Sequence, residues 1–196
     1  LSWRKSMNQE KKAFVFFAPG FEEIEAITPV DILKRGGVKV LMISITDELK
    51  VKGAHNIEII CDSLIEDMDE NILPDAIIMP GGMPGATNLA NCKKLEEFAK
   101  KCFNEKKLVC AICASPAIVF GAFGLLKNKN WTCYPDMENN APEADVKNWN
   151  ANPVVVDTNL ITSRGPGTAA AFSYTILQEL GLSEKSAALQ KGMLFI

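Results

Sequence analysis

The chain has 196 residues, of which 47% are hydrophobic and 23% are charged, and it carries a net charge of -3 at pH 7. This length and balance are typical of one globular domain with a substantial core, and the weak negative charge does not indicate nucleic-acid binding. No apolar run approaches the roughly 20 residues needed to cross a bilayer. We therefore expect neither nucleic acid nor membrane as a partner.

The N-terminal segment differs in composition from the rest of the chain. Residues 1–12 are polar and basic and contain no apolar signal core. We predict that they form a tail, either disordered or derived from a leader or an expression vector. Residues 13–196 are expected to form a single domain.

The cysteines are irregularly spaced in a chain that is large enough to bury its own core. Both features argue against a disulfide framework and favour free thiols in a reducing compartment, hence a cytoplasmic protein. The six cysteines are Cys61, Cys92, Cys102, Cys110, Cys113 and Cys133.

The first half of the chain alternates between apolar runs of strand length and segments with helical spacing. In chain order we expect a strand at 13–18, a helix at 22–35, a strand at 38–45, a hairpin at 47–62, a strand at 75–79 and a helix at 88–105. Pro29 falls inside the first helix and should kink it or shift its start.

The second half continues the same alternation. In chain order we expect a strand at 107–112, a helix at 115–123, an irregular polar segment at 131–150, short strands at 154–156 and 160–162, and helices at 167–180 and 183–191. Uncharged strands that alternate with helices predict a parallel sheet covered on both faces. The predicted fold class is α/β, a three-layer flavodoxin-like sandwich with a mostly parallel sheet.

The most informative stretch is the end of the strand at 107–112. The apolar run stops at Cys113, and small residues and Pro116 follow, as suits a tight turn and the first turn of a helix. This is a cysteine version of the nucleophile elbow that hydrolases build around serine. The dipole of the following helix should favour the thiolate form of Cys113.

Sites in open α/β sheets form beyond the carboxyl ends of the strands. That rule brings together residues 20–25, the pair Gly81-Gly82, and Cys113. Two glycines after a strand allow backbone N–H groups to approach a ligand closely. Together with the N–H of Ala114, they predict an oxyanion pocket.

Three acidic residues, Glu22, Glu23 and Glu25, crowd the start of the first predicted helix. Acidic residues in a first turn complement the helix dipole, which accounts for Glu22 and Glu23. Alternatively, one of the three turns inward toward the thiol. Burial would then raise its pKa, keep it protonated and let it donate to the sulfur. Composition does not decide which one does so.

Two other arrangements are disfavoured. Cys110 and Cys113 spell C-x-x-C, but Cys110 lies inside the predicted strand, so the two side chains should point to opposite faces. His55 is the only histidine, and its place in the hairpin should keep it away from the sheet edge. We therefore expect neither a dithiol pair, nor a metal site, nor a Cys-His dyad.

With these residues in place, the sequence resembles the ThiJ/PfpI superfamily, in the branch typified by the Parkinson-associated protein deglycase and the bacterial ThiJ-like proteins. The matching motifs keep the family order and stand at 18–25, 29–31 with 35–37, 79–82 with 85–89, 111–116 and 162–168. The resemblance implies that Cys113 is the nucleophile and redox-sensitive thiol, and that Glu25 is its carboxyl partner. It also implies oxyanion N–H groups on Gly82 and Ala114, no cofactor, and a homodimer.

Two residues depart from the pattern of the wider family. The peptidase-like branch has a histidine directly after the cysteine, where this chain has Ala114. Several relatives have a histidine before a proline in the middle segment, where this chain has Tyr134 before Pro135. A phenol with a pKa near 10 can form hydrogen bonds in a substrate site but is a poor base at pH 7. Proteolysis is therefore disfavoured.

Two functions stay open on this reading. The first is a cofactor-independent glyoxalase or protein deglycase, in which Cys113 attacks methylglyoxal-like dicarbonyls or glycated adducts and Glu25 moves a proton. The second is a redox-sensing or chaperone protein of the oxidative-stress response, with an oxidisable Cys113 and little turnover.

Overall fold

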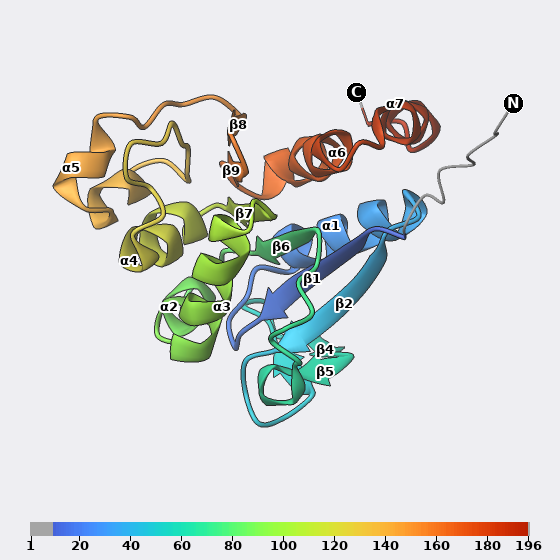
Figure 1. The fold of residues 1–196 in the computed structure, drawn as a ribbon, viewed down its shortest axis with the longest axis horizontal. Helices are drawn as coiled ribbons and strands as arrows, with labels where there is room; N and C mark the ends of the chain where they lie inside the picture. The colour runs from blue at the N-terminus through green and yellow to red at the C-terminus, as the bar shows by residue number, and fades with distance from the viewer. Residues whose placement is uncertain (1–9, 196) are drawn as a thin grey trace, which may run out of the picture.

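A seven-stranded sheet forms the centre of the computed structural model, which describes residues 10–195 (Figure 1). The strands lie in the order β5-β2-β1-β6-β7-β9-β8, and all neighbours are parallel except β8 and β9. Their bounds are β1 Lys12–Phe17, β2 Lys39–Ser44, β5 Ser63–Leu64, β6 Ala76–Met79, β7 Leu108–Ile112, β8 Val154–Asp157 and β9 Leu160–Ser163. This arrangement confirms the predicted flavodoxin-like α/β fold.

Helices cover both faces of the sheet, which makes the three layers (Figure 1). Successive strand residues point to opposite faces, so β1 sends Phe14 and Phe16 into one apolar layer and Val15 and Phe17 into the other. The first layer contains residues of α2 and α3, and the second contains residues of α1 and α6. The helices are α1 Glu23–Arg35, α2 Gly85–Ala90, α3 Lys93–Asn104, α4 Gly121–Phe123, α5 Glu143–Val146, α6 Ala169–Glu179 and α7 Ser183–Gly192.

The hairpin predicted at 47–62 is present as a separate two-stranded antiparallel ribbon. Its strands are β3 Lys50–Lys52 and β4 Glu58–Ile60, and Gly53 follows β3 at the turn. The two-residue strand β5, which pairs with the end of β2, was not predicted because it is too short to show a pattern. The first strand begins at Lys12, one residue before the domain start predicted at residue 13. Most of the tail predicted at 1–12 lies outside the described residues.

Two helix predictions need correction, and one of the two effects expected from Pro29 is absent. The helix expected at 88–105 is two helices, because Asn91 ends α2 and Cys92 adopts extended geometry before α3 begins. The helix expected at 115–123 begins as a π-helical turn, Pro116–Phe120, and only then continues as α4. Pro29 does not shift the start of the first helix, since α1 begins at Glu23 and includes the proline.

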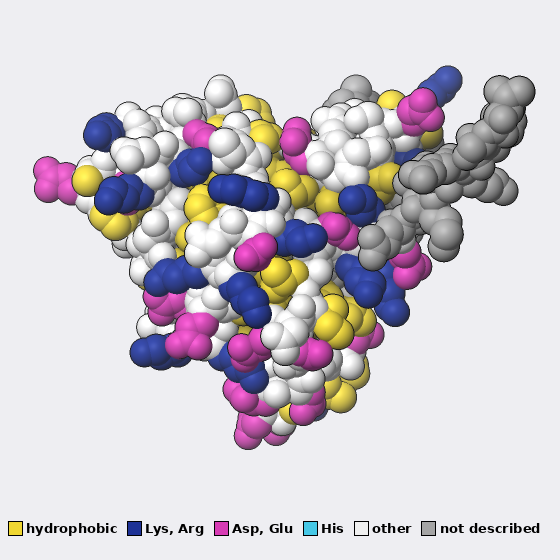
Figure 2. Space-filling view, viewed as in Figure 1, with side chains coloured by type: hydrophobic (Ala, Val, Ile, Leu, Met, Phe, Trp, Pro, Cys, Tyr) yellow, Lys and Arg dark blue, Asp and Glu magenta, His cyan; other side chains and the backbone are white. Residues whose placement is uncertain are grey.

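The segment predicted as irregular, 131–150, contains a 3-10 turn at Met137–Asn140, the single-turn helix α5 and an isolated parallel bridge between Trp131 and Trp149. Acidic and basic side chains are interspersed on the face of the molecule shown in Figure 2.

Among the described residues, no helix is both long enough and apolar enough to cross a bilayer.

Candidate active site

Cys113 directly follows β7 and has a left-handed backbone, with φ 66°. A non-glycine residue in this region carries strain on the order of 1–3 kcal/mol, and such strain persists only where the surroundings hold it. Two hydrogen bonds do so here: the Cys113 N–H donates to the Ser163 carbonyl at 3.0 Å, and its carbonyl accepts from the Tyr134 N–H at 2.8 Å. The thiol therefore stands on a strained strand-to-helix turn, as the sequence predicts.

The turn is also tied to the neighbouring strand β6. Ser115 is fully buried, and its Oγ donates to the carbonyl of Pro80 at 2.6 Å. The bond fixes the elbow against the glycine loop that follows β6. We assigned Ser115 no such role from the sequence, because nothing in the pattern identifies its partner.

Glu25 is the glutamate that turns inward, and its side chain is fully buried on the first turn of α1. Its carboxyl faces the Cys113 thiol within hydrogen-bonding reach, and its Oε2 accepts the Gly81 N–H at 2.9 Å. Its Oε1 is buried and has no hydrogen-bond partner of good geometry among the described residues. Glu22 instead caps the helix by accepting the Glu25 N–H at 2.8 Å.

The two reactive groups shift each other's titration. Burial raises the pKa of Glu25 from 4.5 to about 7, against the hydrogen bonds from Cys113 and Gly81, which lower it. Burial and the Glu25 carboxylate raise the pKa of the Cys113 thiol, against the N–H groups of Ala114 and Gly82, which lower it. The expectation that the helix dipole lowers the pKa of Cys113 is therefore wrong in its net direction: the Ala114 N–H at the start of the following helix lowers the pKa, but burial and the Glu25 carboxylate raise it by more.

The glycine loop after β6 lies so close to Cys113 and Glu25 that a side chain at Gly81 would overlap them. A Cβ added to Gly81 would lie 2.7 Å from Cys113 Cβ and 2.7 Å from Glu25 Oε2. The N–H groups of Gly82 and Ala114 both point at the Cys113 sulfur. Gly82 itself has φ 89°, a conformation that favours glycine. The predicted oxyanion residues thus lie where they can donate to an atom bound to sulfur.

Tyr134 lies beside the same group of residues. A Cβ added to Gly165 would lie 3.3 Å from the Tyr134 ring and 4.0 Å from Glu25 Oε1, so Gly165 separates the ring from the buried carboxyl oxygen. The Tyr134 side chain is about half exposed, and its contact with Cys113 is made by the backbone N–H. The structure therefore brings together all five residues that the sequence singled out, while their catalytic roles stay predictions.

His55 is closer to this edge of the sheet than the sequence suggested. The hairpin docks on the start of α1, where the Ala54 N–H donates to the Phe21 carbonyl at 2.8 Å and His55 Nδ1 lies 2.7 Å from Glu23 Oε2. Partial burial favours a higher pKa for Glu23, but the hydrogen bonds from His55 outweigh it and lower the pKa of Glu23 below its usual value. The imidazole is thus engaged by the carboxylate of Glu23.

The remaining cysteines are not partners of Cys113. Cys110 is fully buried in the apolar layer beneath α1 and α6, and all six cysteines are free. Within residues 10–195, the group of side chains close enough to hold a metal ion is Glu22, Glu23 and His55, whose ligand atoms lie within 4.8 Å of one another. Cys113 is not a member of that group.

The chain is similar to known proteins in sequence and in fold. Residues 11–179 match the DJ-1/PfpI family. The chain is 36% identical over 186 residues to "Glutathione-independent glyoxalase DJR-1.2" of Caenorhabditis elegans, covering 94% of this chain and 97% of that protein. It superposes on the structure "Toxoplasma gondii DJ-1, oxidized" with a TM-score of 0.89 and 32% identity, covering 94% and 98% of the two chains.

Some relatives are much longer than this chain. "Protein DJ-1 homolog B" of Arabidopsis thaliana is 40% identical over 177 residues, which cover 90% of this chain but 40% of that protein. The second Arabidopsis thaliana relative is likewise covered over only 44% of its length. The chain thus spans less than half the length of these two proteins.

Proposed function

The chain belongs to the DJ-1/PfpI family, and on that premise we propose that it is a cofactor-independent glyoxalase or protein deglycase acting on methylglyoxal-like dicarbonyls or their adducts. The observation that carries the proposal is the contact between Cys113 and the buried Glu25, whose pKa is raised to about 7. A carboxyl with a pKa near neutrality can both take up and release a proton at physiological pH. The relative named as a glutathione-independent glyoxalase supports the reaction class.

The first step is addition of the sulfur to the aldehyde carbon. The ionised Glu25 takes the thiol proton as the carbon–sulfur bond forms, and the carbonyl π electrons move to oxygen. In this proposal the N–H groups of Gly82 and Ala114, which point at the sulfur, stabilise that oxyanion. Glu25 then returns the proton to the oxygen, which gives a neutral hemithioacetal and restores the carboxylate.

The second step is an internal proton transfer. The Glu25 carboxylate removes the proton from the former aldehyde carbon, and the electron pair moves onto the ketone oxygen, which gives an enediolate. Glu25 delivers the same proton to the neighbouring carbon, while the hydroxyl proton on the sulfur-bearing carbon moves to the former ketone oxygen. A ketone and a hemithioacetal thus become a hydroxyl and a thioester without an external oxidant, and Glu25 is again a carboxylate. Water then hydrolyses the thioester, which releases lactate from methylglyoxal and restores the thiol. The unpartnered Glu25 Oε1 is the atom free to take part in this transfer.

The test is lactate formation from methylglyoxal in the absence of glutathione. We expect Cys113→Ala to lower the rate by at least about 100-fold, since it removes the nucleophile. Cys92→Ala is the matched control, because Cys92 lies between α2 and α3, and should leave the rate unchanged. Equal rates for Cys113→Ala and the wild type would overturn the proposal.

A redox-sensing role is the second candidate, favoured by one observation. Cys113 is the cysteine that meets both a carboxyl group and two backbone N–H donors, groups that can hold the oxygens of a sulfinate. After mild peroxide treatment, mass spectrometry should find two added oxygens on Cys113 and few on the other cysteines. Uniform oxidation of all six would contradict this role. The homodimer implied by the resemblance and the cytoplasmic location inferred from the cysteines stay predictions.

A further inference from the structure

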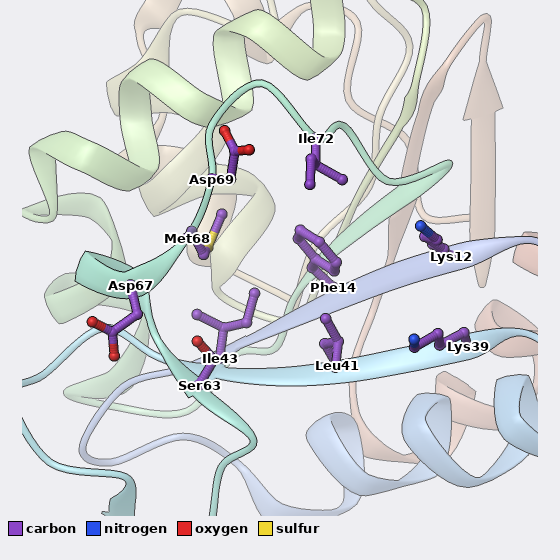
Figure 3. Close-up of a pocket in the computed structure, with 10 residues that line it drawn as sticks. All are labelled: Lys12, Phe14, Lys39, Leu41, Ile43, Ser63, Asp67, Met68, Asp69 and Ile72. Atoms are coloured by element: carbon purple, nitrogen blue, oxygen red, sulfur yellow. The ribbon is translucent and has the colours of Figure 1, made fainter.

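A cavity of about 260 Å³ lies on the sheet near its β5 edge (Figure 3). Its floor is formed by Phe14 of β1 and by Leu41 and Ile43 of β2, and one end is flanked by Lys12 and Lys39. These lysines are the first residues of β1 and β2. The charged end of the cavity therefore lies at the amino ends of β1 and β2. Cys113 follows the carboxyl end of β7 and so lies at the opposite end of the parallel strands. The cavity is separate from the site described above.

The alternation of strand residues produces the lining. Residues two apart along a strand share a face, so Lys39, Leu41 and Ile43 point the same way, as do Lys12 and Phe14. At about 3.3 Å per residue, the lining from Lys39 to Ile43 is about 13 Å long, of which the apolar part from Leu41 to Ile43 takes about 7 Å. The surface thus presents two ammonium groups followed by a strip of aliphatic and aromatic carbon.

The two lysines are held side by side without a counter-ion. Lys12 and Lys39 are register partners on neighbouring parallel strands, where like charges repel. Neither forms an ion pair among the described residues, and Asp75, which accepts the Lys12 N–H, pairs instead with Lys11 and Lys107. The nine residues that precede the described chain contain no acidic side chain. An anion between the two ammonium groups would relieve their repulsion.

The opposite wall and the far end of the cavity have a different character. Met68 and Ile72 face the floor from the loop before β6, and Ile72 is 51% exposed although it is apolar (Figure 3). Asp67 and Asp69 line the cavity away from the two lysines, and neither forms an ion pair among the described residues, although Asp69 accepts the Asn71 N–H. A ligand with an apolar body would cover Ile72, and the carboxylates of Asp67 and Asp69 would repel an anionic group from their end. The charges therefore define one orientation for an anionic ligand.

We propose that this cavity binds a small amphiphilic carboxylate, with its carboxylate between Lys12 and Lys39 and its apolar body on Phe14, Leu41 and Ile43. At about 30 Å³ for each water-sized group, the volume corresponds to about nine non-hydrogen atoms, the size of a medium-chain fatty acid or an arylalkanoic acid. The proposal does not depend on the chemistry at Cys113.

Octanoate is a suitable probe, titrated into the full chain and followed by isothermal calorimetry and by amide chemical shifts. We expect saturable binding that shifts the amides of β1, β2 and the loop at 67–72. Octanol and octylammonium lack the negative charge that pairs with the two lysines, so they should bind more weakly than octanoate. The expected difference is at least about fivefold and no larger than modest, because an exposed ion pair contributes little free energy. Equal affinity for octanoate and octylammonium would overturn the proposal, as would shifts located elsewhere.

Three variants separate the contributions. Replacing both lysines, Lys12→Gln with Lys39→Gln, should weaken octanoate binding about tenfold, and Ile72→Gln should weaken it through the apolar body instead. Lys127→Gln, an exposed lysine outside the cavity, is the matched control and should bind like the wild type. Cys113→Ala should also bind normally. Unchanged affinity in both the double-lysine variant and Ile72→Gln would refute the site.

Discussion

The buried carboxyl of Glu25 makes the stability of the protein depend on pH in a defined direction. Its pKa is raised from 4.5 to about 7 on folding, which corresponds to about 3 kcal/mol. Below 4.5 the carboxyl is protonated in both the folded and the unfolded state, so folding carries no charge penalty. Above about 7 it is ionised in both states, and the folded state carries the full penalty. The free energy of unfolding should therefore fall as pH rises between these values.

The variant Glu25→Gln keeps an oxygen that can accept the Gly81 N–H and cannot ionise. Urea unfolding should show that it is more stable than the wild type by up to about 3 kcal/mol at about pH 8, and by little at about pH 4.5. Glu97→Gln removes a charge from an exposed position on α3 and should show no such pH dependence. A difference between Glu25→Gln and the wild type that does not change with pH would refute the reasoning.

Three further predictions concern the surroundings of the thiol. Gly81→Ala should destabilise the fold by about 1–3 kcal/mol in urea unfolding and lower lactate formation, because the new Cβ overlaps Cys113 and Glu25. Tyr134→Phe should leave kcat/KM for methylglyoxal unchanged, because Tyr134 contacts Cys113 through its backbone N–H; a large loss would assign a role to the phenol. Glu23→Gln should destabilise the protein at neutral pH, with a difference from the wild type that disappears as pH falls through the lowered pKa of Glu23; a difference that grows on acidification would contradict this sign.

The sheet could be predicted from the sequence because its strands are buried on both faces. Runs such as 13–17 and 108–112 carry no charge, and their length and the glycines or small residues that follow fix where they end. The helix predicted at 88–105 failed because apolar spacing persists across Asn91 and Cys92, where only the backbone geometry shows a break. The strand β5 pairs through two residues, too few for any periodicity.

The site could be located from the sequence but not described. The rule that parallel strands expose their carboxyl ends at one edge brought residues 20–25, Gly81-Gly82 and Cys113 together. The spacing of the acidic residues did not identify Glu25, since the choice depends on which side chain α1 turns inward. The pKa of Cys113 was predicted in the wrong direction, because burial and a neighbouring carboxylate are properties of the folded chain.

The proposed reaction needs Cys113 to form the covalent bond and Glu25 then to move the proton. The most direct measurement follows lactate release and the three-carbon unit bound to Cys113 in the same quenched reaction with methylglyoxal. For the wild type, lactate should accumulate. Glu25→Gln also lacks the base of the first step, so the unit should form on Cys113 more slowly but then stay there, and lactate should form at least about 100-fold more slowly. Lactate released by Glu25→Gln at the rate of the wild type would contradict the account.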